Sequence, residues 1–159
     1  MKRLLVASFA LGIATLGLAA CDDAAEHAAP AETGIPGVTI GNPRMVLAAV
    51  PGNPAAVYFD LAYDNDRSLA LNRVSVEGAK SAEFHDYGMW DSKMQMQPML
   101  PLPLKKGDKV EFKPGGKHVM VMGVPATMKP GGTAKVTIVV SGGGKQTFDA
   151  PIKAAGDDR

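Results

Sequence analysis

The chain has 159 residues, which is enough for one domain of ordinary size. It carries 17 basic and 16 acidic residues, so no basic excess is available to bind a nucleic acid backbone. Nine methionines stand against a single cysteine. One cysteine excludes a disulfide framework, a thiolate zinc site and an iron–sulfur cluster, because each of these needs more than one thiol.

The N-terminus predicts an export signal. Residues 1–3 are short and basic, residues 4–20 are apolar and uncharged, and the order Leu-Ala-Ala-Cys ends at Cys21. This order resembles the lipobox of bacterial lipoproteins. The resemblance implies a signal peptide at residues 1–20, a lipid anchor on Cys21 and a periplasmic, membrane-attached protein, on either the inner or the outer membrane. An ordinary signal peptide or a membrane anchor with a chance cysteine is the alternative.

The remaining chain divides into a tether, a domain and a tail. Residues 21–34 are small and polar and predict a flexible tether, in which His27 is solvated or makes an auxiliary metal contact. Residues 35–154 alternate short apolar runs with turn residues, which predicts an all-β sandwich or barrel. One such turn, at residues 41–43, is expected to end a strand. Residues 155–159 form a short polar tail.

One strand of this domain already shows which face it buries. Successive side chains of a strand point to opposite faces, so every second residue of 56–63 shares one face. The residues on the more apolar face are the core candidates: Val57, Phe59, Leu61 and Tyr63.

Seven methionines gather near two histidines. They are Met89, Met94, Met96, Met99, Met120, Met122 and Met128, close to His85 and His118. Methionine is a common core filler, but residues 94–99 mix it with glutamine and proline, which suits a buried strand poorly. In residues 118–122 strict alternation would place His118 and its two methionines on one face and Val119 and Val121 on the other.

These donors favour one metal. Thioether sulfur is soft and neutral and prefers Cu(I), which imidazole also binds. Zinc sites use thiolates, histidines and carboxylates, and a blue copper centre needs a cysteine ligand. The only cysteine is the predicted lipid attachment point, so copper(I) binding without electron transfer is the expected chemistry.

The spacing of four residues is more specific than the clustering. His85, Met96, His118 and Met120 follow the pattern H-x10-M-x21-H-x-M, which resembles the signature of PCuAC-type periplasmic copper chaperones. The resemblance covers residues 35–154 and implies a cupredoxin-like or immunoglobulin-like antiparallel β-fold with these four residues as Cu(I) ligands. It also implies copper transfer toward the binuclear centre of cytochrome c oxidase, on its copper-bearing subunit, often with a thiol-containing partner chaperone, or a general role in copper homeostasis. No Met or His follows Met128, so a second, tail-based copper site is not expected.

Four neighbours of these residues have two interpretations. They could cover the metal, or they could be packing and rim residues: Met89, Trp90, Met94 and Met122. The alternative function is an immunoglobulin-like lipoprotein that uses exposed methionines for protein contacts and holds no metal. An enzyme is not expected, because no Ser/His/Asp arrangement or acid–base pair stands out.

Overall fold

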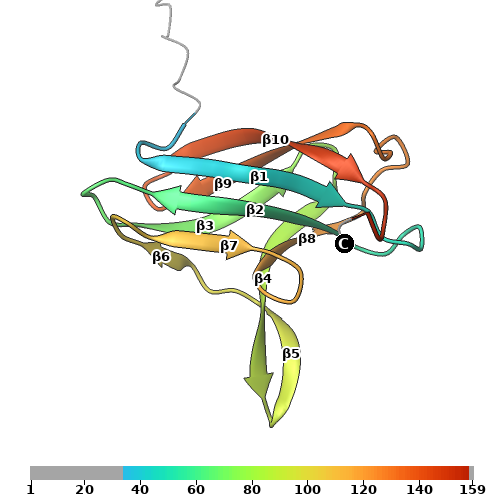
Figure 1. The fold of residues 1–159 in the computed structure, drawn as a ribbon, viewed down its shortest axis with the longest axis horizontal. Helices are drawn as coiled ribbons and strands as arrows, with labels where there is room; N and C mark the ends of the chain where they lie inside the picture. Colours follow the sequence, from blue (N-terminus) through green and yellow to red (C-terminus); the bar gives the residue numbers. More distant parts are fainter. Residues whose placement is uncertain (1–33, 158–159) are drawn as a thin grey trace, which may run out of the picture.

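The computed structural model describes residues 34–157, and these form ten β-strands and no α-helix (Figure 1). The strands are β1 (Val38–Val46), β2 (Ala55–Tyr63), β3 (Leu69–Val76), β4 (Ser81–Trp90), β5 (Lys93–Pro98), β6 (Leu102–Leu104), β7 (Lys109–Phe112), β8 (His118–Met122), β9 (Thr133–Val140) and β10 (Lys145–Lys153). Within this part of the chain no helix could span a membrane. The predicted signal peptide, Cys21, His27 and most of the tether lie outside the described residues.

The strands hydrogen-bond in the order β5-β4-β8-β2-β1-β10-β9-β3-β6, with β7 also paired to β2. The expected all-β fold is therefore confirmed. Every strand pair is antiparallel, as predicted, apart from β1 and β10, which run parallel. These are the first and last strands, so no hairpin joins them and nothing in the connection forces an antiparallel pair.

The core is built from the alternation of β2 and of the strands around it. Val57, Phe59, Leu61 and Tyr63 are all buried, as predicted. Phe59 stacks on Phe112 of β7 with ring centroids 4.3 Å apart, and it lies 5.1 Å from Phe148 of β10. Since β1 separates β2 from β10 in the sheet order, the second contact crosses the interior of the sandwich.

Strand β1 corrects one expectation. The turn predicted at residues 41–43 does not end the strand; β1 passes through a bulge between Gly41 and Arg44 and resumes pairing with β2. Asn42 takes a left-handed φ of 49°, and its side-chain amide donates to Asp60 Oδ2 at 2.7 Å. Pro43 has no backbone N–H to donate to the ladder, but residues in a bulge are left unpaired. These turn-forming residues are therefore compatible with a continuous strand.

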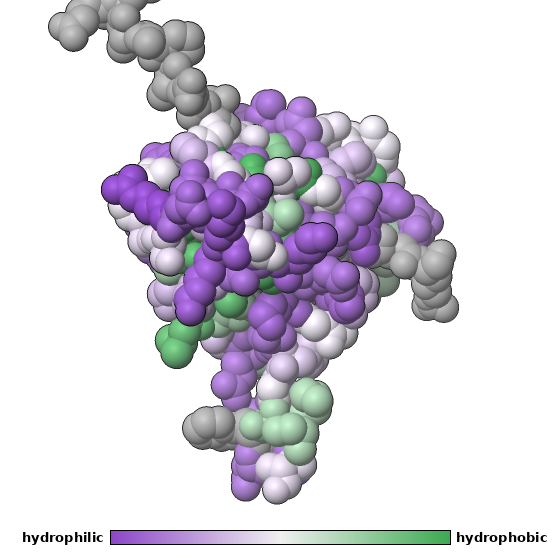
Figure 2. Space-filling view, turned by 60° about the vertical axis from the view of Figure 1, so that its left-hand side comes forward, coloured by the Kyte–Doolittle hydropathy of each residue, from purple (hydrophilic) through white to green (hydrophobic). Residues whose placement is uncertain are grey.

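Strand β4 was not predicted, although it connects the body to a hairpin. Residues 81–85 pair with β8, and residues 85–90 pair with β5. Figure 1 shows β5 and the outer part of β4 projecting away from the sandwich. In the space-filling view this projection carries pale green, apolar residues at the bottom of the molecule (Figure 2).

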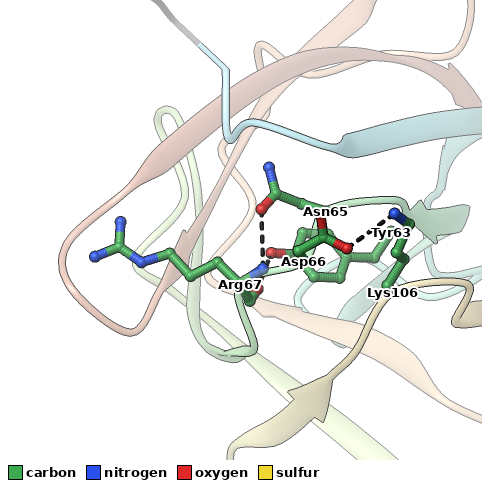
Figure 3. A network of polar contacts seen from close by, with 5 residues as sticks. All are labelled: Tyr63, Asn65, Asp66, Arg67 and Lys106. Atoms are coloured by element: carbon green, nitrogen blue, oxygen red, sulfur yellow. Dashed lines mark hydrogen bonds and ion pairs between the residues drawn. The ribbon is translucent and has the colours of Figure 1, made fainter.

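A polar network fixes the turn that follows β2. The Tyr63 hydroxyl donates to the Arg67 carbonyl oxygen, and the Arg67 N–H donates to Asn65 Oδ1 at 3.0 Å (Figure 3). Lys106 Nζ donates to Asp66 Oδ1 at 2.9 Å in the same view. Tyr63 is the last residue of β2, whereas β8 pairs with the first three residues of β2. The network therefore stabilises the end of β2 that is remote from His118.

Candidate metal centre

Two strands place the predicted histidines directly opposite each other. In the antiparallel pair β4–β8, His85 is the partner of His118, and their ring centroids lie 5.9 Å apart. Val119 and Val121 point the other way and are fully buried, as the alternation predicted. The histidines are nevertheless only 8% and 7% exposed, so the pair sits in a sheltered part of the sheet surface.

The two predicted methionine ligands lie on the same face as this pair. Met120 is the partner of Glu83 in β4, and Met96 of β5 is the partner of Tyr87 in β4. Directly opposed residues share a face, and alternate residues along β4 share it too. The four residues of the spacing pattern therefore occupy one face across β8, β4 and β5.

The His118 ring has a defined orientation. Its Nδ1 lies 2.8 Å from the Gly116 carbonyl oxygen, and its Nε2 lies 3.1 Å from Met96 Sδ. A carbonyl oxygen only accepts, so Nδ1 carries the proton, and in the neutral ring Nε2 presents a lone pair. That lone pair and the thioether sulfur face each other. Metal-bound histidines commonly have their far nitrogen fixed in this way by a backbone carbonyl, which leaves the other nitrogen free to coordinate.

The His85 ring differs because neither of its nitrogens has a hydrogen-bond partner among the described residues. Glu83 Oε2 lies 3.7 Å from Nε2, beyond hydrogen-bond distance. Burial lowers the pKa of His85 below its ordinary value of 6.5, and the nearby His118 lowers it further, while Glu83 opposes both effects. Buried polar atoms are normally satisfied, so two free imidazole nitrogens fit a residue that takes a ligand.

An open groove of about 420 Å³ borders the site and is lined by Met96, His118 and Met120. Two tyrosines that the sequence analysis did not single out also line it. The rings of Tyr58 and Tyr87 lie 6.5 Å and 5.8 Å from the His118 ring, respectively. Alternation could have found both, since Tyr58 faces away from the core set of β2 and Tyr87 lies two residues after His85.

The predicted neighbours are more spread out. Met89 and Met94 are partners near the hairpin turn, and Met122 is the partner of Ser81 at the other end of the β4–β8 ladder. Trp90 is the last residue of β4, opposite Lys93. Met99 and Met128 pack against the core. The seven clustered methionines therefore separate into two at the candidate centre, two at the outer end of the hairpin, two that pack against the core, and Met122, which is exposed at the far end of the β4–β8 ladder.

Among the residues described, no three or more His, Cys, Asp or Glu side chains form a group that could hold a metal ion. The candidate centre is instead made of two imidazoles and two thioethers. All four ligand groups are uncharged in their coordinating form, and a soft monovalent cation is the ion that such a set prefers.

Comparison with solved structures finds PCuAC domains. The apo PCuAC domain of PmoF2 has a TM-score of 0.65 and 21% identity, over 79% of this chain and 97% of that domain. The copper-bound PCuAC domain of PmoF2 has a TM-score of 0.62 and 22% identity, over 76% of this chain and 96% of that domain. The solution structure of CuI-DR1885 from Deinococcus radiodurans has a TM-score of 0.54 and 27% identity, over 82% of this chain and 87% of that protein.

The fold is thus that of PCuAC-type domains, and the resemblance drawn from the spacing pattern is confirmed. The LpqE-like family model, whose description is that of a lipoprotein, matches residues 38–152. The chain belongs to the LpqE-like family. No curated protein sequence matches it.

Proposed function

We propose that this protein is a copper(I) chaperone that holds Cu(I) with His85, Met96, His118 and Met120. The observation that carries the proposal is the 3.1 Å approach of His118 Nε2 to Met96 Sδ, with Nδ1 committed to a backbone carbonyl. Two lone pairs facing each other repel unless a cation or a proton lies between them. Two of the similar structures, the copper-bound PCuAC domain of PmoF2 and CuI-DR1885, hold copper, and this supports the choice of ion.

The site suits transfer better than storage. Met96 is 40% exposed and borders an open groove together with Met120, so an incoming ligand can reach the ion from the thioether side. The histidines are buried and hold the ion from the sheet side. Neutral thioethers exchange without gaining or losing a proton, so handover needs no acid–base step. This arrangement supports binding and transfer rather than catalysis.

The location and partners that we propose rest on the sequence resemblance. We place the protein in the periplasm, anchored to a membrane through lipid on Cys21, and the lipoprotein description of its family supports this. The recipient we propose is the copper-bearing subunit of cytochrome c oxidase, reached directly or with a thiol-containing copper chaperone, with general copper homeostasis as the broader role.

The test is X-ray absorption on the Cu(I)-loaded protein, paired with Cu(I) stoichiometry under reducing conditions. We expect mixed nitrogen and sulfur donors and one bound ion, which is lost in His118→Ala and weakened in Met96→Leu. Met122→Leu removes a thioether from the same face, two residues beyond Met120, and should bind copper as the native chain does.

Failure of the native protein to bind Cu(I) would favour the metal-free interaction module. The exposed methionines of the hairpin are the observation that supports that second function.

A further inference from the structure

Two methionines at the outer end of the hairpin have no explanation in the packing of the domain. Met89 is 66% exposed and Met94 is 64% exposed, the largest exposures among the described methionines. Met99 and Met128, by contrast, pack against the core. Exposing two large apolar side chains costs hydrophobic free energy that burial would recover, so their role is not packing.

The strand register places these two side chains together. Met89 and Met94 are direct partners in the β4–β5 ladder, and opposed residues have Cβ atoms about 4.5–5.5 Å apart on the same face. That face is the one that carries Met96 and the two histidines. Met96 follows Met94 by two residues on β5, so the Met89–Met94 pair lies two ladder positions outward from the proposed copper ligand, on the same face.

A two-residue turn fixes this pairing. Trp90 and Lys93 are partners, so Asp91 and Ser92 alone make the connection, with φ values of 49° and 60°. Positive φ at both central residues defines the turn that matches the twist of a hairpin. Because the register is set by this turn, the two thioethers are held opposite each other in the free protein.

We propose that Met89 and Met94 form a second site for a soft monovalent cation, Cu(I) or Ag(I), separate from the four-residue centre. This rests on the proposed function only for the identity of the natural ion. The ion would be held by two neutral thioether sulfurs, with its other coordination positions open. Asp91 and Lys93 at the turn carry opposite charges, so sulfur must supply the affinity. Two donors hold an ion less tightly than four, and the pair should therefore fill second.

The experiment is a titration of the full-length protein, labelled with ¹³C at the methionine methyl groups, with silver nitrate. Ag(I) is a soft monovalent ion that stays in one oxidation state. We expect the methyl signals of Met96 and Met120 to move with the first equivalent and those of Met89 and Met94 to move with the next. Zinc chloride should move neither pair of signals.

Two variants test the assignment. Met89→Leu/Met94→Leu keeps the apolar volume and should lose only the second binding event. Met122→Leu, which removes an exposed thioether from the same face, should retain both events.

Unchanged Met89 and Met94 signals at excess Ag(I), or a second event that survives in the double variant, would overturn the second site. Silent Met96 and Met120 signals beside moving Met89 and Met94 signals would instead reject the four-residue centre and retain the second site.

Discussion

The sandwich body and the β4–β5 hairpin use the same residue types in opposite ways. Met45 of β1 is fully buried and contributes to the core, whereas Met94 of β5 is 64% exposed. In β2 buried and half-buried positions alternate along the whole strand, while in β5 nearly every position is exposed. Met45 in the body is therefore packing material, whereas Met94 on the hairpin is an available sulfur donor.

The comparison separates stability from chemistry. The body holds the aromatic and β-branched contacts that pay for folding, and the hairpin can present its donors without weakening that core. The two regions meet at one residue pair, His85 and His118, since β4 passes from β8 to β5 at His85. A change in either region should therefore leave the other largely intact.

The largest expected effect comes from the core. Phe59→Ala removes a fully buried ring that contacts Phe112 and Phe148, and it should lower the free energy of unfolding by about 3–5 kcal/mol. Met94→Leu on the hairpin should change it by no more than about 0.5 kcal/mol. Urea unfolding followed by circular dichroism measures both. Equal losses in the two variants would show that the hairpin folds as part of the core.

The next effect should be confined to the hairpin. Ser92 has a φ of 60°, which costs a residue with a Cβ about 1 kcal/mol relative to glycine. Ser92→Gly should therefore stabilise the closed hairpin, and amide hydrogen exchange should slow in β5 but not in β9. Asp91→Ala, which keeps a Cβ at a φ of 49° and removes the short polar side chain suited to it, should act in the opposite direction. Slower exchange throughout both strands would contradict the separation of the two regions.

The sequence predicts the body better than the hairpin for a physical reason. Alternation identified the buried face of β2 and the two faces of β8, because one face of each strand is apolar. Strand β4 has no such contrast: Phe84 alone is a strong core residue in its inner half, and Gly88 interrupts the outer half. Spacing could place His85 and Met96 in one pattern. Only the three-dimensional register could show His85 opposite His118 or Met89 opposite Met94.

The junction between the regions should respond to pH. An unfolded histidine titrates near 6.5, and burial and His118 lower the pKa of His85 in the folded protein against the opposing pull of Glu83. The unfolded state then binds more protons below that value, so the copper-free protein should lose stability as the pH falls from about 6.5 through the folded pKa. Urea midpoints across this range measure it. His85→Gln should flatten the dependence of the urea midpoint on pH. An equally steep dependence in that variant would show that another group causes the loss of stability.

The smallest effect concerns a contact on the opposite face of the junction. Lys117 Nζ lies 2.8 Å from Asp86 Oδ2 and links the residue before His118 to the residue after His85. Both side chains are about one-third exposed, at 33% and 35%, so solvent screens the pair and it should contribute only about 0.2–1 kcal/mol. A double-mutant cycle with Lys117→Met and Asp86→Asn isolates the coupling, which should shrink in high salt. A coupling of zero at low salt would mean that the backbone ladder alone sets the opposition of the two histidines.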